Sequence, residues 1–408
     1  MLSVLSELRG RALLVLIGCV IVQLGLGYGY TGAPLAPYLL EEFGWSRAQL
    51  ASTRSLQPVL LALSSPVVGF LTVRYGARFV MMSGAVVLGV TYMAGAGVQS
   101  WLQLAGMWIA QGLSVAFLGD IAVGAVLSQW TERSRALALG IAYSGANIGG
   151  AIAARSLVAI AEQASWRMAL FVLGAAALVV ILPAALLLIR DRGSDGVAGE
   201  SGPAPAETAP MPEETLPLRV VLGTRSFWIL AFSHVSYWLL MLMVLEHFVL
   251  MLEDLGVARS VATAHLANFT LLGGIAKVVF GAGATLLHLS ARAAILLDFA
   301  LLVLSAGLLL VLENPWAVTA FVLFFGFGYA ARDVVTPLAI AHCFGVGAVA
   351  QVYGLLMLTF LLSPLGTILA GLSFDRTGSY DSAIVAFGTL VSLSFLLLFW
   401  LRDERPSS

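Results

Sequence analysis

The chain has 408 residues, of which 60% are hydrophobic and only 11% are charged. Soluble domains carry roughly 25% charged residues, so this composition excludes an ordinary soluble protein and indicates a polytopic membrane protein. The net charge of −1 gives no reason to expect a nucleic acid as partner. The two cysteines, Cys19 and Cys343, lie in apolar segments and offer neither a disulfide framework nor a metal site, so we expect no cofactor and no metal.

Hydrophobic runs of about 20 residues, the length at which a helix crosses a bilayer, recur along the chain with short polar breaks. They predict an all-α membrane protein with twelve transmembrane helices in two pseudo-symmetric six-helix bundles. The first run is too long for a removable signal peptide and lacks its cleavage site. The runs lie near residues 12–35, 49–72, 79–97, 102–128, 136–159, 168–190, 226–251, 261–287, 292–312, 315–340, 350–373 and 381–401.

The arginines between these runs predict which side of the membrane each loop faces. An even number of spans places both termini on one side, and most loop arginines fall on that side. By the positive-inside rule we expect the termini to be cytoplasmic, in a multi-pass protein of a bacterial inner membrane. The arginines on the opposite side are fewer: Arg47, Arg167, Arg259 and Arg376.

Residues 191–225 differ from the rest because they are rich in Pro, Gly, Ala and Glu and poor in aromatic residues. Such a segment buries too little apolar surface to order itself, so we expect a flexible cytoplasmic linker. It separates an N-terminal bundle, residues 1–190, from a C-terminal bundle, residues 226–408. A weak internal repeat supports this division: residues 69–78 and 283–292, in equivalent loops, keep small and basic residues at the same offsets.

This organisation resembles the major facilitator superfamily over essentially the whole chain. The superfamily's loop after the second helix has the pattern G-x-x-x-D-R-x-G-R-R. Val73 stands at the aspartate position, and Leu287 stands there in the second copy. The resemblance implies that this aspartate helps to lock the cytoplasmic face, so the lock lacks its acid in both halves. The sequence matches the pattern at four gating-loop positions, Gly69, Arg74, Gly76 and Arg78.

Three stretches are similar to the monocarboxylate-transporter branch, which includes oxalate/formate exchangers. They are the glycine-rich first run with the Phe-Gly-Trp-Ser-Arg sequence that follows it, residues 130–145, and residues 371–380. In that branch the eighth helix carries a basic residue, often with an aspartate four positions earlier. Lys277 stands at the basic position and Gly273 at that of the aspartate. Proton coupling by that pair is therefore not implied.

Lys277 is the only lysine of the chain and lies near the middle of the apolar residues 266–286. An ammonium there costs at least about 2.5–3.5 kcal/mol on insertion scales, and intramembrane charges are functional candidates by default. We expect Lys277 to face a polar cavity and to bind a carboxylate. The alternative is a structural ion pair with an acid of a neighbouring helix.

Other polar residues within the runs are candidates for the same site, each with a structural alternative. Arg54 either holds an anion or extends to the outer headgroups, and Arg332 serves as a second anion contact or as a gate. Tyrosine hydroxyls can orient a carboxylate or belong to an interfacial girdle, and asparagine amides can instead bond between helices. The substrate-binding candidates are Lys277, Arg54, Arg332, Tyr28, Tyr30, Tyr237, Asn268 and Asn147.

Acidic and histidine side chains within the runs are candidates for carrying a coupled proton. Asp120 could instead pair with an arginine, and the Glu246–His247 step could simply face the headgroups. Adjacent helical residues point about 100° apart, so Arg332 and Asp333 need not pair. We expect Asp298 to be a structural partner, with Arg332 as the candidate for the group that it pairs with. The proton-coupling candidates are Asp120, Asp333, Glu246 and His247.

These observations favour a monomeric secondary transporter of small organic anions, mono- or dicarboxylates, that works by alternating access. Proton symport or exchange against a counter-anion would drive it. Motifs of nucleotide-binding domains, metalloproteases and serine hydrolases are absent from the sequence, so we expect neither ATP-driven transport nor an enzyme. The alternatives are a proton-driven efflux pump for amphipathic compounds and a non-transporting sensor on the same scaffold. Positive charge in mid-membrane argues against the pump, whereas the missing loop aspartates mildly favour the sensor.

Overall fold

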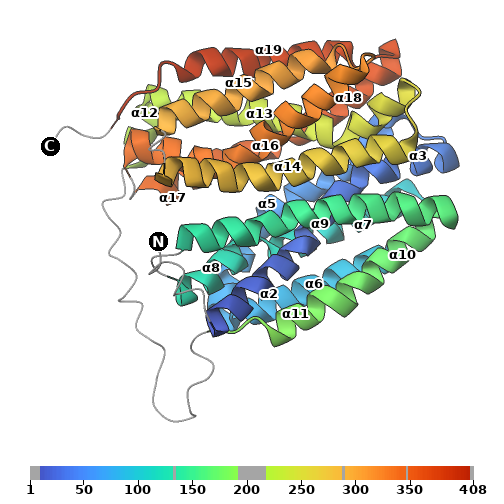
Figure 1. Cartoon of the computed structure of the whole chain (residues 1–408), viewed down its shortest axis with the longest axis horizontal. Coiled ribbons are helices and arrows are strands. Elements are labelled where there is room, and N and C mark those ends of the chain that lie inside the picture. The colour runs from blue at the N-terminus through green and yellow to red at the C-terminus, as the bar shows by residue number, and fades with distance from the viewer. Residues whose placement is uncertain (1–9, 132–134, 192–216, 287–289, 346–347, 405–408) are drawn as a thin grey trace, which may run out of the picture.

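The computed structural model describes residues 10–131, 135–191, 217–286, 290–345 and 348–404. These residues form two helical bundles that lie side by side (Figure 1). The described part of the chain contains helices and no strands, which confirms the expected all-α fold. Most of the expected linker, Arg133 of the second stretch and Leu287 of the repeated loop lie outside the described residues, while Leu218–Gly223 forms the short helix α12.

The N-terminal bundle runs back and forth through α2–α3, α4–α5, α6, α7–α8, α9 and α10–α11. Several spans are broken, the first by a 3₁₀ turn at the Gly-Tyr-Gly-Tyr sequence. The bounds are α2 (Arg11–Leu26), η1 (Gly27–Thr31), α3 (Gly32–Phe43), α4 (Arg47–Arg54), α5 (Leu56–Tyr75), α6 (Ala77–Gly95), α7 (Trp101–Leu118), α8 (Asp120–Trp130), α9 (Arg135–Gln163), α10 (Trp166–Ala176), η2 (Ala177–Ile181) and α11 (Leu182–Leu187).

The C-terminal bundle repeats this course through α13, α14, α15, α16, α17–α18 and α19. Its fifth span is broken by a 3₁₀ turn just before Pro364, which cannot donate a helical hydrogen bond. The bounds are α13 (Arg225–Asp254), α14 (Arg259–Leu286), α15 (Ala291–Leu309), α16 (Pro315–Phe344), α17 (Val349–Met357), η5 (Leu358–Leu362), α18 (Pro364–Thr377) and α19 (Asp381–Leu398).

Within the described residues, ten helices are long and apolar enough to cross a membrane, and the bent α16 adds an eleventh. The second expected run corresponds to α4 and α5, which together form a further span that is not counted among these eleven. The count is thus consistent with the twelve spans that the sequence predicts.

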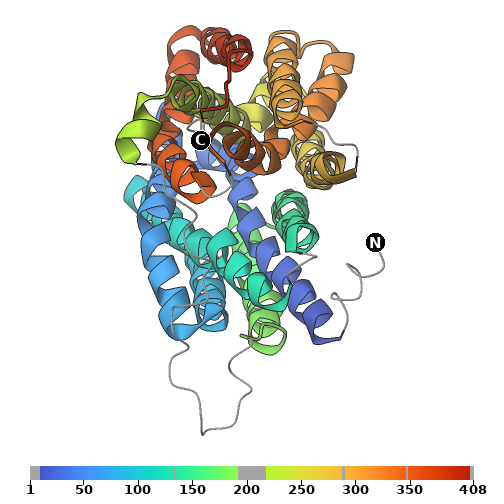
Figure 2. The same cartoon turned by 90° about the vertical axis from the view of Figure 1, so that its left-hand side faces the viewer.

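Each bundle has its own apolar core, and the view along the helices shows the two bundles one above the other (Figure 2). The bundles meet along α9 and α14, and also where α3 packs on α13 and α4 on α18. The latter two contacts lie at the end of the bundles that includes the α3–α4, α13–α14 and α18–α19 connections, which we call the distal end. The first span also packs tightly on α9, where a Cβ at Gly27 or Gly149 would overlap backbone atoms of the facing helix.

Candidate functional site

Lys277 in α14 forms an ion pair with an acid from another helix. Its Nζ lies 3.0 Å from Oδ2 of Asp333 in α16. The structural alternative considered for Lys277, an ion pair with a neighbouring helix, is thus present. The pair is still open to solvent, because the side chain of Asp333 is 41% exposed and that of Lys277 is 11% exposed. An accessible ion pair can be exchanged for an ion pair with a ligand, whereas a sealed one cannot.

Asp333 is shared between two cations. Its Oδ1 lies 3.1 Å from Nη2 of Arg332, although adjacent helical residues need not pair. The Arg332 guanidinium also lies 2.6 Å from Nε2 of His234 and stacks 4.5 Å from the ring centres of Tyr237 and Trp238. His234 in α13 was not among the candidates, although it precedes Tyr237 by nearly one helical turn.

Tyr329 in α16 connects the two bundles and was also not among the candidates. Its hydroxyl accepts a hydrogen bond from Nδ2 of Asn147 at 2.6 Å and lies 3.4 Å from the hydroxyl of Tyr30. Its backbone carbonyl accepts from the hydroxyl of Tyr237 at 2.6 Å. Its ring fills the space beside Gly273, where a Cβ would lie 2.6 Å from the ring. Position 273, which carries an aspartate in the monocarboxylate branch, therefore has no room for that side chain, because the Tyr329 ring fills the space beside it.

Asp120, the first residue of α8, faces this group from the N-terminal bundle. It is exposed, its Oδ1 accepts a hydrogen bond from Nε2 of Gln23 at 3.2 Å, and it interacts electrostatically with Lys277. The structure thus brings together Lys277, Asp333, Arg332 and Tyr30 with Asp120 opposite. We call these five residues, together with Tyr329, His234 and Asn147, the central cluster.

Other candidates lie elsewhere in the molecule. Tyr28 donates to the carbonyl of Leu173 at 2.9 Å within the N-terminal bundle, so it does not face Lys277. The Oδ1 of Asn268 accepts from Nη2 of Arg155 at 2.5 Å, away from the central cluster.

Asp298 is fully buried, and neither of its carboxylate oxygens has a hydrogen-bond partner among the described residues. The expected ion pair of Asp298 with Arg332 is therefore not formed, although Arg332 acts on it electrostatically.

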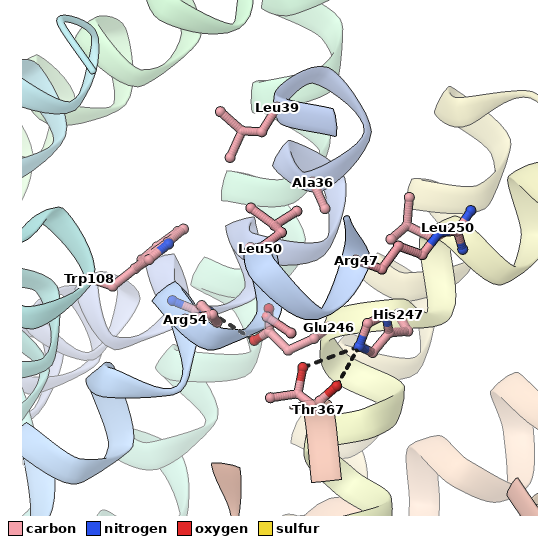
Figure 3. A pocket seen from close by; sticks show the side chains of 12 residues that line it. Ala36, Leu39, Arg47, Leu50, Arg54, Trp108, Glu246, His247, Leu250 and Thr367 are labelled. Atoms are coloured by element: carbon pink, nitrogen blue, oxygen red, sulfur yellow. Dashed lines mark hydrogen bonds and ion pairs between the residues drawn. The ribbon is translucent and has the colours of Figure 1, made fainter. Parts of the chain in front are cut away.

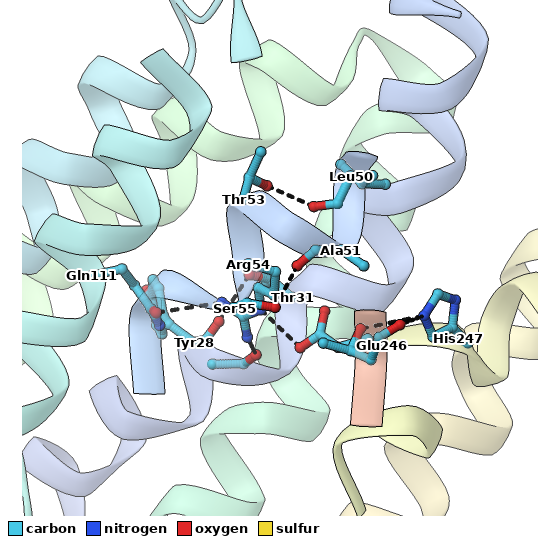
Figure 4. A network of polar contacts seen from close by, with 12 residues as sticks. Tyr28, Thr31, Leu50, Ala51, Thr53, Arg54, Ser55, Gln111, Glu246 and His247 are labelled. Atoms are coloured by element: carbon cyan, nitrogen blue, oxygen red, sulfur yellow. Dashed lines mark hydrogen bonds and ion pairs between the residues drawn. The ribbon is translucent and has the colours of Figure 1, made fainter. Parts of the chain in front are cut away.

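Arg54 and Glu246 form a second polar cluster towards the distal end (Figure 4). Nε of Arg54 lies 2.8 Å from Oε1 of Glu246, and the two side chains are 8% and 12% exposed. The neighbouring His247 bonds to the carbonyl of Thr367 at 3.0 Å and to the hydroxyl of Tyr380 at 3.2 Å. A headgroup-facing position for Arg54, Glu246 and His247 is therefore wrong, because all three are enclosed by protein.

Comparison with known proteins decides the family. A sequence model described as "Major Facilitator Superfamily" matches residues 17–297. The chain belongs to the Major Facilitator Superfamily. It is therefore a multi-pass membrane transport protein rather than an enzyme, with a small-molecule substrate.

Related members of the superfamily include monocarboxylate transporters. Monocarboxylate transporter 11 of Homo sapiens is 29% identical, over 94% of this chain and 81% of the relative, and that of Mus musculus is 28% identical, over 94% and 86%. The MFS-type transporter pynF of Aspergillus niger is 27% identical over 44% of this chain and 42% of the relative. The crystal structure of the nucleoside transporter NupG superposes with a TM-score of 0.74 at 11% identity, covering 96% of this chain and 100% of that chain, which shows the shared fold.

The loop between α5 and α6, where the sequence matches the superfamily's pattern, is held by an acid from outside the pattern. Gly76 has a φ of 85°, which favours glycine, and ends α5 just before α6 begins. The carboxylate of Asp191 accepts hydrogen bonds from the backbone N–H groups of Ala77 at 3.2 Å and Arg78 at 3.3 Å. An acid thus lies against the first turn of α6, where the helix dipole favours it, although Val73 stands at the loop's aspartate position.

Two of the stretches similar to monocarboxylate transporters meet at the distal end of this superfamily member. Asp375 accepts hydrogen bonds from the backbone N–H groups of Arg47 at 3.1 Å and Ala48 at 2.9 Å. The Arg47 guanidinium pairs with Asp254 at 2.6 Å and also donates to the hydroxyl of Tyr380. Burial holds the pKa of Tyr380 above its usual value, so the phenol stays neutral beside Arg47. These bonds, together with the Arg259–Glu41 ion pair, tie the two bundles to each other.

Proposed function

We propose that this transporter carries small monocarboxylates, and that the carboxylate of the substrate binds to Lys277. The observation that carries the proposal is the accessible ion pair between Lys277 and Asp333. A substrate carboxylate can replace the Asp333 carboxylate on the same ammonium when Asp333 gives up its contact with Lys277. The similarity to monocarboxylate transporters over 94% of the chain supports this substrate class.

The central cluster favours binding of one negative charge together with one proton. Asp333 contacts both Lys277 and Arg332, and Asp120 lies opposite, so two cations face two acids; the buried Asp298 forms no ion pair with either cation among the described residues. An added carboxylate would leave an uncompensated charge, which is costly where solvent access is restricted. Protonation of Asp333 removes that charge and frees Lys277 at the same time. Asp333 is therefore our choice for the proton-coupling residue, with Asp120 as the second candidate.

The hydroxyl groups beside Lys277 can orient the substrate. The hydroxyl of Tyr30 lies 3.4 Å from that of Tyr329, to which Asn147 also donates. Tyr30 and Asn147 belong to the N-terminal bundle, whereas Lys277 and Tyr329 belong to the C-terminal bundle. A substrate held between them would contact both halves, residues 1–190 and 226–408, whose rocking would alternate its access to the two sides.

Uptake into proteoliposomes tests the proposal. Labelled lactate, pyruvate, formate, oxalate, malonate and succinate would each be offered with an inward proton gradient and, separately, with internal unlabelled anion. We expect a monocarboxylate to accumulate with the proton gradient, and Lys277→Gln to abolish uptake while Lys277→Arg retains part of it. Unchanged affinity and rate in Lys277→Gln, or no flux of any of these anions through folded protein, would overturn the proposal.

A further inference from the structure

The guanidinium of Arg54 is surrounded by groups of the N-terminal bundle. Its Nη1 lies 3.4 Å from Oε1 of Gln111, and another of its nitrogens donates to the carbonyl of Gly29. The guanidinium stacks 4.1 Å from the ring centre of Trp108 (Figure 3). Arg54 belongs to α4, Gln111 and Trp108 to α7, and Gly29 to η1. The arginine is thus held in place by its own bundle.

Two of these neighbours carry buried donors without acceptors. Nε2 of Gln111 and Nε1 of Trp108 have no hydrogen-bond partner among the described residues, and the two residues are 0% and 2% exposed. A buried N–H group without an acceptor is unfavourable. Arg54 contacts both Gln111 and Trp108, so the arginine and the two unpaired donors belong to one group of packed side chains, which suits an anion with several acceptor atoms.

The anion that Arg54 contacts here comes from the other bundle. Glu246 belongs to α13 and is the acid paired with Arg54, whereas Gln111 and Trp108 belong to α7 and Gly29 to η1. The fit is tight, because a Cβ at Gly32 would lie 2.8 Å from both Nε of Arg54 and Oε2 of Glu246. A cavity of about 20 Å³, enough for about one water molecule, adjoins the pair. A separation of the bundles at the distal end would remove Glu246 from Arg54 and leave the contacts of Arg54 within its own bundle in place.

We propose that Arg54, Gln111 and Trp108 form a second carboxylate-binding site, which Glu246 occupies while the distal end is closed. When that end opens, a small carboxylate from solution takes the place of the Glu246 carboxylate. The identity of that carboxylate as the transported substrate rests on the function proposed above.

The second site is separate from Lys277, but neighbouring residues of η1 contact the two sites. Gly29 contacts Arg54, whereas the next residue, Tyr30, interacts with Lys277 and Tyr329. The η1 turn therefore contacts both sites, Arg54 through Gly29 and the central cluster through Tyr30. Arg54 would receive the anion first and Lys277 second.

Binding of acetate to purified full-length protein tests the site independently of transport. The background variant is Lys277→Gln, which removes the central ammonium, and Glu246→Gln is added to free Arg54. Because Trp108 stacks on Arg54, we expect a saturable change in tryptophan fluorescence with acetate. Further addition of Arg54→Gln should abolish it, and further addition of Trp108→Phe should remove the signal. Size-exclusion chromatography would establish that each variant is folded. No saturable change, or an unchanged response with Arg54→Gln, would overturn the proposal.

Uptake measurements separate an anion site from a simple lock between the bundles. For an anion site, we expect Glu246→Gln to lower the external KM several-fold and Arg54→Gln to raise it at least tenfold. The exchanged pair, Arg54→Glu with Glu246→Arg, restores a lock but moves the arginine to the other bundle, so we expect the KM to stay high. Restoration of the KM by the exchanged pair would overturn the second site. If the wild-type protein transports no carboxylate, the function proposed above fails, while the acetate titration still decides whether Arg54 binds an anion.

Discussion

At the scale of single residues, the partner of Lys277 depends on how two helices pack. Tyr329 occupies the space beside Gly273, so the acid cannot come from the same helix as in the monocarboxylate branch. Asp333 supplies it from α16, at 3.0 Å from the ammonium. The same acid also contacts Arg332, at 3.1 Å. A change in one carboxylate therefore alters the partners of two cations at once.

Replacement of Asp333 by asparagine should separate binding from coupling. The amide has nearly the same shape but can neither take up a coupled proton nor compete as an anion for Lys277. We expect Asp333→Asn to retain exchange of labelled for unlabelled substrate and to lose at least tenfold in accumulation driven by a proton gradient. Both are measured in proteoliposomes. Asp120→Asn is the matched control, and a selective loss of accumulation in that variant would assign the coupling to Asp120 instead.

Substitution of Gly273 should destabilise the protein through Tyr329. A Cβ at this position lies 2.6 Å from the tyrosine ring, so Gly273→Ala forces the ring or the helix to move. Overpacking of this kind costs about 1–3 kcal/mol. We expect a lower melting temperature in detergent, partly restored by the additional change Tyr329→Leu. If Gly273→Ala melts like the wild-type protein, the space beside Gly273 is not limiting.

The importance of Lys277 could be predicted from the sequence, because a lone lysine in an apolar run is conspicuous. Its partner could not, because hydropathy fixes where a helix lies but not how it is rotated about its axis. For the same reason Arg54 and Lys277 were grouped as contacts for one substrate, whereas the structure places them in different clusters. Tyr329 and His234 were not among the candidates. A tyrosine or a histidine has an apolar ring and a polar tip, so its presence in an apolar run does not distinguish a binding site from a packed interface.

At the scale of elements, glycines determine how closely the first span approaches α9. A Cβ at Gly27 would overlap the backbone at Gly149 and Gly150, and one at Gly149 would overlap the backbone of Leu24. The glycines of the first span can be read from the sequence, but the helix that they pack against cannot. This contact fixes η1, and η1 presents Gly29 to Arg54 and Tyr30 to the central cluster.

An added methyl group should disrupt this contact at Gly149 but be tolerated where a glycine faces open space. The atoms opposite Gly149 belong to the backbone and cannot turn aside, so we expect Gly149→Ala to lower the melting temperature in detergent and to reduce uptake. Gly307 in α15 is the control, since a Cβ there meets no atom within 4 Å. Gly307→Ala should be neutral or slightly stabilising, by up to about 1 kcal/mol. Equal effects of the two substitutions would show that the close contact with α9 has no particular role.

At the scale of the whole molecule, the ion pairs between the bundles gather at the distal end. Arg47 joins Asp254, Asp375 and Tyr380, while Arg259 joins Glu41. The hydrophobic runs and the linker between them predict two bundles, and two of the stretches similar to monocarboxylate transporters include the residues that meet here. That the two stretches meet depends on the relative placement of the bundles, which a pattern within one helix does not encode. If the termini are cytoplasmic, as the arginines predict, the structure is closed towards the outside.

Loss of the Asp375 carboxylate should open the distal end. It holds the backbone N–H groups of Arg47 and Ala48, so Asp375→Asn weakens the tie between α18 and α4. Ala51→Cys in α4 provides a reporter cysteine. Ala51 is 4% exposed and lines the small cavity next to Arg54. With Cys19 and Cys343 replaced by serine, we expect a membrane-impermeant maleimide added from the distal side to label this cysteine at least several-fold faster in Asp375→Asn. Asp381→Asn changes an exposed acid at the same end and should leave the rate unaltered. Equal labelling rates with and without Asp375→Asn would mean that Asp375 does not hold the distal end closed.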